Sequence, residues 1–384
     1  AQALCRAIAE PDAAYVRQTT GLPLSPYFSA AKMAWLLRRC PAVQEAAQRG
    51  TLCLGTVDTW LLFCLTEGRT FATDVSNASR TQLMDLLHTR WDPQLLALFG
   101  IPPEALPEIR CSDDLFGTTT LGGLFPQDVP IRAVMGDSHA ALYGAGCGRE
   151  GMAKATYGTG SSVMLFTGRQ PVVSRHGLAA TVAWGRNGQT YYGLEGNINY
   201  AGAVIEWLIH RAGLLTSADE AEALALQAAP ADRTVFVPAF TGLGAPHWAP
   251  EMRAAIVGMG STTGRAEIVR AAVDSIAYQV TDVLRAMAED VGQPAAQLFC
   301  DGGAVRNSYL MQRQSELLRS VIRVAENQDG SCAGAAKMAG EAAGLYGGDT
   351  VFGAWQREYR PQQSAAWAEA EYGRWQSAVK QIKG

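Results

Sequence analysis

Hydrophobic positions follow two different spacings along the second half of the chain. Short β-prone runs that end in glycine turns predict a meander of strands, at 153–157, 162–167, 180–184 and 190–194, and further strands at 235–237, 254–257 and 297–300. Apolar residues at helical spacing predict helices near 199–212, 217–228, 268–287 and 310–321, and a last one from about Gly334. Because strand, glycine turn and helix alternate, this half reads as an α/β domain.

The first part of the chain has a different texture. Residues 1 to about 110 are predicted to be mostly helical, with a buried helix at Trp60–Leu65. Val129–Met135 is apolar and β-prone, ends in Gly136-Asp137, and leads into a predicted helix that reaches Gly144. A chain of 384 residues is long enough for two domains of ordinary size, which we place at 1–145 and 146–384.

Composition and charge restrict the possible partners. The net charge of −4 provides no basic field for nucleic acid or for an acidic membrane, so neither is expected as a partner. The longest apolar runs are far shorter than a membrane span, and the first residues do not resemble a secretory signal, which predicts a soluble, cytoplasmic protein.

The eight cysteines show no C-x-x-C spacing and no matching pair of histidines. We therefore predict no metal site and no disulfide framework, with most cysteines acting as small core residues in a reducing compartment.

A carboxylate stands at the predicted strand-to-helix junction, in Gly136-Asp137-Ser138-His139. Asp137 there has two possible roles. It can be a general base that takes the proton of a substrate hydroxyl during phosphoryl transfer. It can equally be a helix N-cap, since Asp is among the best capping residues.

Two glycine turns could approach an anionic ligand. Residues 157–162, Tyr-Gly-Thr-Gly-Ser-Ser, join two extended runs and form either a phosphate cradle or a plain hairpin turn. Asp301-Gly302-Gly303 follows a strand and opens a helix that carries Asn307, so it is either a ligand-contacting turn or a tight connection that needs small residues. The chain has neither a Walker A pattern nor G-x-G-x-x-G after a strand.

Several ordered blocks resemble the FGGY family of carbohydrate kinases, most closely its glycerol kinase branch. They run along nearly the whole chain, at 20–35, 55–61, 73–80, 238–246 and 254–274, in addition to the turns described above. The resemblance implies an actin- and hexokinase-like fold of two ribonuclease-H-like domains, with ATP and substrate in the cleft between them. The implied activity is transfer of the ATP γ-phosphoryl group to a hydroxyl of a polyol or sugar, with Mg²⁺ as the metal and a homo-oligomer, dimer or tetramer, as the assembly.

The same resemblance assigns roles to individual residues. It makes Asp137 the base and places Tyr27 in the polyol pocket. The implied nucleotide contacts are Thr159 and Gly160 at the phosphates, Gly202 through its backbone, Glu206 where the family has glutamine, and Gly303 with Asn307 at the adenine.

The sequence departs from the glycerol kinase pattern near the substrate. Ser138-His139 replaces Gln-Gln, and Ser162 stands where an aromatic residue is usual. Ser138 and Ser162 are therefore expected to give a larger, hydroxyl-rich pocket that suits a longer polyol or a sugar better than glycerol.

The start of the chain and one motif leave two alternatives. The family's opening strand-turn-strand with Asp-Gly-Thr has no counterpart in this sequence, so we expect an N-terminally incomplete first domain, and the protein could be a non-catalytic nucleotide- or sugar-binding remnant. Read instead as a nucleophile elbow, the Ser138 segment suggests a serine hydrolase, which would need His176, His210 or His247 as its base.

Overall fold

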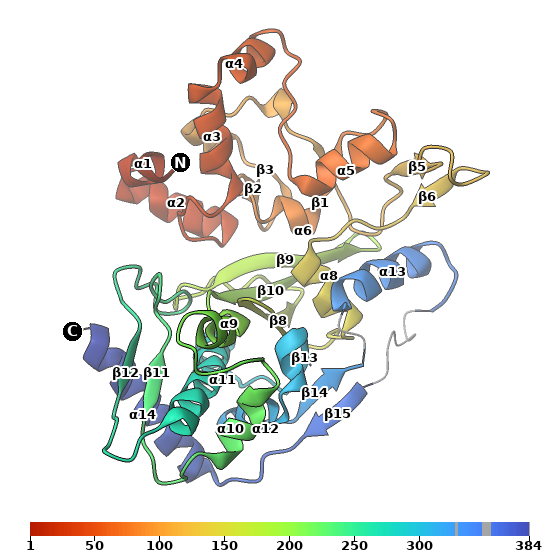
Figure 1. Cartoon of the computed structure of the whole chain (residues 1–384). Helices are drawn as coiled ribbons and strands as arrows, with labels where there is room; N and C mark the ends of the chain where they lie inside the picture. The colour runs from red at the N-terminus through yellow and green to blue at the C-terminus, as the bar shows by residue number, and fades with distance from the viewer. Residues whose placement is uncertain (327–328, 348–354, 384) are drawn as a thin grey trace.

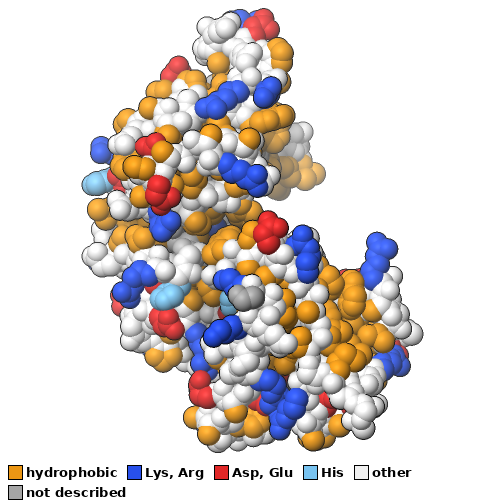
Figure 2. All heavy atoms as spheres, turned by 90° about the vertical axis from the view of Figure 1, so that its left-hand side faces the viewer, with side chains coloured by type: hydrophobic (Ala, Val, Ile, Leu, Met, Phe, Trp, Pro, Cys, Tyr) orange, Lys and Arg blue, Asp and Glu red, His pale blue; other side chains and the backbone are white. Residues whose placement is uncertain are grey.

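A computed structural model describes residues 1–326, 329–347 and 355–383, which form two lobes of unequal size (Figure 1). The smaller lobe holds the N-terminal elements, and the larger lobe holds a seven-stranded sheet with helices on both faces. Figure 2 shows a notch along one side where the two lobes meet.

The smaller lobe is mainly helical. Its helices are α1 (Gln2–Ala7), α2 (Glu10–Thr20), α3 (Ser29–Arg39), α4 (Pro41–Gln48), α5 (Val57–Leu65), α6 (Val75–Ala78), α7 (Pro93–Phe99) and the 3₁₀ turn η1 (Pro103–Ala105). Its strands form two-stranded sheets: parallel β1 (Ala72–Asp74) with β4 (Glu108–Arg110), and antiparallel β2 (Met84–Asp85) with β3 (Arg90–Trp91) and β5 (Gly117–Thr119) with β6 (Val129–Ile131). Its hydrophobic core includes Val16, Met33, Leu95 and Phe99.

The sheet of the larger lobe has the order β15-β14-β13-β7-β8-β10-β9. Its strands are β7 (Met152–Tyr157), β8 (Ser161–Gly168), β9 (Ala179–Arg186), β10 (Gln189–Ile198), β13 (Gln297–Asp301), β14 (Ile322–Ala325) and β15 (Trp355–Tyr359). The pairs β7–β8, β8–β10 and β9–β10 are antiparallel, and β13 runs parallel to both β7 and β14. The four predicted strands are present, but the predicted meander is wrong in its order, because β8 pairs with β10 and β9 lies at the edge. A second small sheet pairs β11 (Val235–Val237) with β12 (Ala255–Val257).

Successive side chains along the strands point to opposite faces of the sheet, and apolar side chains lie on both faces. Leu165 and Leu298 point into the main core, whereas their neighbours Phe166 and Phe299 point into a second cluster on the opposite face. The main core packs on α9 (Gly202–His210), α10 (Glu220–Gln227), α11 (Arg265–Val291), α12 (Ser308–Leu318) and α14 (Ala365–Lys383). The other face packs on α8 (Asp137–Gly144) and α13 (Gly330–Ala342), so α8, which follows the smaller lobe in sequence, packs on the sheet of the larger one.

Three sequence expectations need correction. Only residues 129–131 of the predicted Val129–Met135 strand are extended, because β5 offers just three pairing residues. Helix α5 is not buried: Trp60 is 67% and Val57 83% exposed, so its apolar composition did not reveal its environment. The expectation that most cysteines are core residues is wrong: all eight are free thiols, but six are partly or fully exposed, and Cys147 and Cys300 are buried.

Candidate active site

A cavity of about 440 Å³ lies in the larger lobe, among α9, α10, α11 and the turns that follow β7 and β13. It collects residues that the sequence pointed to separately: Thr159, Gly202, Glu206, Gly303 and Asn307 all line it. Residues more than a hundred positions apart in the chain therefore share one cavity.

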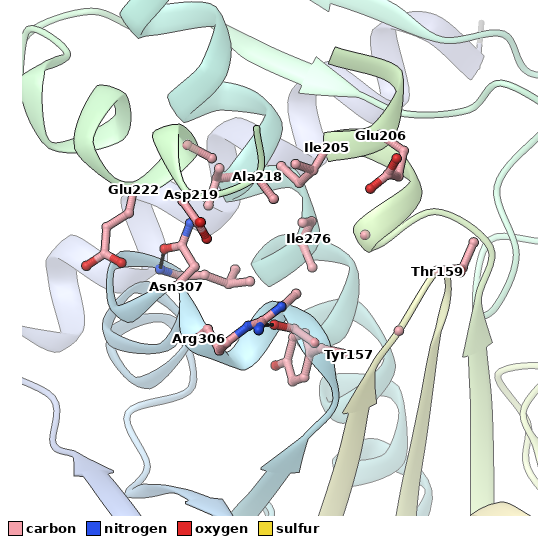
Figure 3. A pocket seen from close by; sticks show the side chains of 17 residues that line it. Tyr157, Thr159, Ile205, Glu206, Ala218, Asp219, Glu222, Ile276, Arg306 and Asn307 are labelled. Atoms are coloured by element: carbon pink, nitrogen blue, oxygen red, sulfur yellow. Dashed lines mark hydrogen bonds between the residues drawn. The ribbon is translucent and has the colours of Figure 1, made fainter. Parts of the chain in front are cut away.

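The two ends of this cavity differ in chemistry (Figure 3). Asp219, Glu222 and Asn307 lie at one end, and Thr159 stands at the other, at the tip of the β7–β8 hairpin. The wall includes the apolar side chains of Ile205, Val273, Ile276 and Leu310. The cation of Arg306 also lines the cavity, between Asn307 and Tyr157 in Figure 3. The apolar part of the wall suits a ligand with a flat apolar body and polar edges near Asn307. A second carboxylate, Glu206, stands on the Thr159 side of the cavity.

The turn after β13 shapes the floor of the cavity. Gly302 has φ +94°, and a Cβ there would lie 2.6 Å from the carbonyl oxygen of Tyr157, so this position requires glycine. By contrast, a Cβ on Gly303 would meet nothing within 4 Å, because it would point into the cavity. Asn307 caps α12 through its Oδ1, which accepts a hydrogen bond of 2.9 Å from the amide of Leu310.

The turn after β7 is fixed by the start of α9. The amide of Gly202 donates to the carbonyl of Gly158 at 2.9 Å, and the amides of Ala201 and Ala203 donate to the carbonyl of Thr159. The Gly202 amide is thus already engaged, so this residue contributes wall rather than a free donor. Gly160 does not line the cavity; a side chain there would collide with the carbonyl of Ile198, which gives it a packing role.

Asp137 is the first residue of α8, and the N-cap is Gly136. The capping alternative for Asp137 is therefore wrong: among the described residues, its Oδ1 accepts a hydrogen bond from the adjacent Ser138 amide alone, at 2.7 Å, and the side chain is exposed. Ser331, at the start of α13, donates its hydroxyl to the Asp137 carbonyl oxygen at 2.8 Å. The backbone of Asp137 is held in place while its carboxylate remains accessible.

His139 follows in the same helix, is buried, and lines neither of the cavities described here. It is 3% exposed, and its Nε2 is 2.9 Å from the Thr181 hydroxyl. Burial, with a smaller contribution from Arg80, lowers the pKa of His139 to about 4 despite the nearby carboxylates Glu195 and Asp137. The imidazole is therefore neutral at physiological pH.

This pKa gives a stability prediction. Because the folded pKa lies below the ordinary value of 6.5, the unfolded chain binds more protons, and the stabilising contribution of neutral His139 is lost as pH falls from 6.5 toward 4. Replacing it by a group that cannot titrate, His139→Gln, should reduce the loss of unfolding free energy between pH 7 and pH 5 by about 2 kcal/mol.

Urea denaturation of both proteins at the two pH values measures this difference. Asp74, whose pKa burial raises to about 6, acts with the opposite sign but equally in both proteins, so it cancels. Equal pH dependence in wild type and variant would contradict the assignment.

A second cavity, of about 380 Å³, lies where the lobes meet and includes Tyr27, which is 64% exposed. Its polar lining was not foreseen from the sequence: Arg80 and Glu195 form an ion pair, with Asn197, Asn199 and Thr241 alongside. The Ser162 hydroxyl lies 3.0 Å from Glu195 Oε1, so Ser162 belongs to the wall behind this cavity. Ser138 does not line it and stays beside Asp137.

The hydrolase alternative fails on geometry. The required histidines are engaged elsewhere: His176 with Asp290, His210 with Glu206, and His247 with Asp282. In the part of the chain that the structure describes, no hydrogen bond joins Ser138 to a histidine.

Within the described ranges, no cluster of three or more His, Cys, Asp or Glu side chains is arranged to hold a metal ion by itself. Over the same residues, no helix has the length and apolar character to cross a membrane.

Comparison with known proteins decides the family. The models of the N-terminal and C-terminal domains of the FGGY family of carbohydrate kinases match residues 1–144 and 153–343. The chain belongs to the FGGY family. Among its relatives, it is 45% identical over 368 residues to a glycerol kinase of Alkalilimnicola ehrlichii and 44% identical over 384 residues to that of Thermus brockianus. These matches cover 96% and 99% of this chain and 74% and 77% of the relatives.

Solved structures agree with this placement. Plasmodium falciparum glycerol kinase with ADP superimposes with a TM-score of 0.92 at 31% identity, covering 99% of this chain and 76% of that one. A xylulose kinase of Lactobacillus acidophilus has a TM-score of 0.85 at 20% identity, covering 96% and 75%, which shows the fold alone. The FGGY protein described here therefore has the expected two-domain actin- and hexokinase-like fold and is an ATP-dependent carbohydrate kinase. The N-terminal family model matches this chain from residue 1, and the chain spans 74% and 77% of the length of the two relatives.

Proposed function

We propose that this kinase transfers the γ-phosphoryl group of ATP to a primary hydroxyl of a polyol or sugar, with Asp137 as the general base. The observation that carries the proposal is the cavity that gathers Thr159, Glu206, Gly303 and Asn307. The adenine would lie against the apolar wall near Asn307, and the phosphates would lie toward Thr159. The exposed carboxylate of Asp137 at the start of α8 supports its proposed role as the base.

The chemistry requires little beyond positioning. The carboxylate of Asp137 accepts the proton of the substrate hydroxyl while the hydroxyl oxygen bonds to the γ-phosphorus. ADP leaves with the electrons of the broken P–O bond. The Thr159 hydroxyl and the fixed β7–β8 turn orient the phosphates. Neutral His139 in the same helix keeps a positive charge away from the base.

Mg²⁺ fits this site as a companion of the nucleotide. Asp137 has one carboxylate oxygen without a protein donor among the described residues, and Mg²⁺ is commonly held by one or two carboxylates plus substrate phosphates. When bound, the ion supplies charge neutralisation at the phosphates.

The substrate class follows from the second cavity. Glycerol kinases among the relatives make three-carbon polyols candidates. The cavity near Tyr27, however, has room and polar groups for more, with Asn197, Asn199 and the Arg80–Glu195 pair on its wall. A polar group that glycerol leaves unpaired would cost about 1–3 kcal/mol, so a four- or five-carbon polyol or ketose should be the better substrate.

The test is phosphoryl transfer from radiolabelled ATP to glycerol, erythritol, xylitol, xylulose and ribulose by the purified protein. We expect kcat/KM for a longer substrate to exceed that for glycerol by about 5- to 100-fold. Glycerol as the best substrate would refute the pocket argument and leave the kinase proposal standing. Absence of transfer to every compound would refute the kinase proposal for this chain and favour a nucleotide-binding remnant.

Two further expectations belong to this proposal. The eight free cysteines are consistent with a reducing compartment such as the cytoplasm, where ATP is also available. A homo-oligomer, dimer or tetramer, stays a prediction that light scattering would test.

A further inference from the structure

Beneath the proposed active site lies a buried ion pair that the proposed chemistry does not use. Lys154 lies in β7 and Asp301 ends β13, and Nζ is 2.8 Å from Oδ1. The two side chains are 3% and 5% exposed, and Lys154 also donates to the Thr156 hydroxyl. A buried pair of this kind is often no more stabilising than apolar residues of similar volume, so stability alone gives little reason for it.

The pair joins the two strands that carry the nucleotide turns. β7 and β13 run parallel, with Asp301 opposite Thr156. β7 leads directly into the Thr159 turn, and Asp301 leads directly into Gly302-Gly303, whose backbone packs against Tyr157. The ion pair therefore lies at the base of both turns.

Asp301 also contacts a third element. A methyl group added to Gly330 would collide with Asp301 Oδ2, so this carboxylate oxygen lies against the first residue of α13. The next residue, Ser331, donates to the Asp137 carbonyl at 2.8 Å. One carboxylate thus connects the phosphate turn, the adenine turn and the helix start that holds the proposed base.

We propose that Lys154 and Asp301 form a positioning pair for phosphoryl transfer, which sets the Thr159 turn, the Gly303 turn and Asp137 relative to one another. The inference rests on the proposed function. Both side chains are buried beneath the cavity and do not line it, so they act through these elements. Small misplacements of reacting groups cost as much as about 100-fold in rate, which gives such a pair a large effect on turnover.

The test replaces both charges together, in K154M/D301L, so that no unpaired charge stays buried. Because apolar replacement of a buried pair is often neutral, the melting temperature should change little. We expect kcat to fall roughly 10- to 100-fold, with a smaller change in KM for ATP. The matched control is R270M/D232L, which removes a largely buried pair between α11 and the loop before β11, and it should retain kcat.

Hydrogen exchange supplies a readout that does not depend on activity. In K154M/D301L, amides of residues 157–160, 301–307 and 330–334 should exchange faster together, whereas the control should match wild type. Unchanged kcat and unchanged exchange in a folded K154M/D301L would overturn the proposal. If that variant does not fold, D301N, which keeps the side-chain volume, is measured by the same two readouts and judged by the same outcomes. A wild-type protein without transfer activity would refute the proposed function, and the exchange data would still decide whether the pair couples these elements.

Discussion

Asp137→Asn is expected to lower kcat by about two to four orders of magnitude, the range typical for loss of a general base. Asparagine keeps the shape of the side chain and can still accept the Ser138 amide, so helix α8 should be undisturbed. Since Gly136 rather than Asp137 provides the N-cap, the variant loses no capping interaction. Affinity for ADP measured without Mg²⁺ should therefore stay nearly unchanged.

Steady-state kinetics and calorimetric titration measure the two quantities. Asp128→Asn is the matched control, because Asp128 is an exposed carboxylate in the loop between β5 and β6, outside helix α8. It should behave as wild type. An Asp137→Asn protein within threefold of wild-type kcat would show that another group removes the proton.

Local patterns predicted much of the larger lobe. Strand runs bounded by glycine turns marked β7, β8, β9 and β10, and helical periodicity marked α11. These signals worked because the strands are buried along most of their length and stand out as short apolar runs between glycine turns, whereas the apolar positions of α11 recur at helical spacing. Hydrophobic patterns failed to predict burial where it depends on segments distant in the sequence. The apolar helix α5 lies on the surface, and nothing in its own composition distinguishes that position from a core.

The candidate site shows the same division. Glycine turns and a carboxylate after a β-prone run identified Thr159, Gly303 and Asp137 as candidate site residues. The family resemblance then assigned each of them a role. The Arg80–Glu195 pair was missed because its partners are 115 positions apart and stand next to no glycine turn. The sequence singled out the turn that begins at Asp301 but not its pairing with Lys154, since register between β7 and β13 brings the two side chains together. Pairing between distant strands is a tertiary property that neither segment records alone.

Gly303→Val is expected to weaken ATP binding by about 10- to 100-fold without loss of fold stability. A Cβ at this position meets no protein atom within 4 Å, so the branched side chain would enter the cavity and not a packed core. It would occupy volume that the proposed adenine position needs, and forcing extra methyl groups into filled space costs about 1–3 kcal/mol.

The adjacent glycine is the natural comparison. Gly302→Ala places a Cβ 2.6 Å from the Tyr157 carbonyl at φ +94°, so it should lower the melting temperature clearly, because both the clash and the backbone conformation are unfavourable. Calorimetric titration with ATP and thermal denaturation of both variants should therefore give opposite signatures: lost affinity with retained stability for Gly303→Val, and lost stability for Gly302→Ala. Unaltered ATP affinity in a folded Gly303→Val protein would mean that the turn after β13 only connects strand to helix, and the nucleotide would have to bind elsewhere.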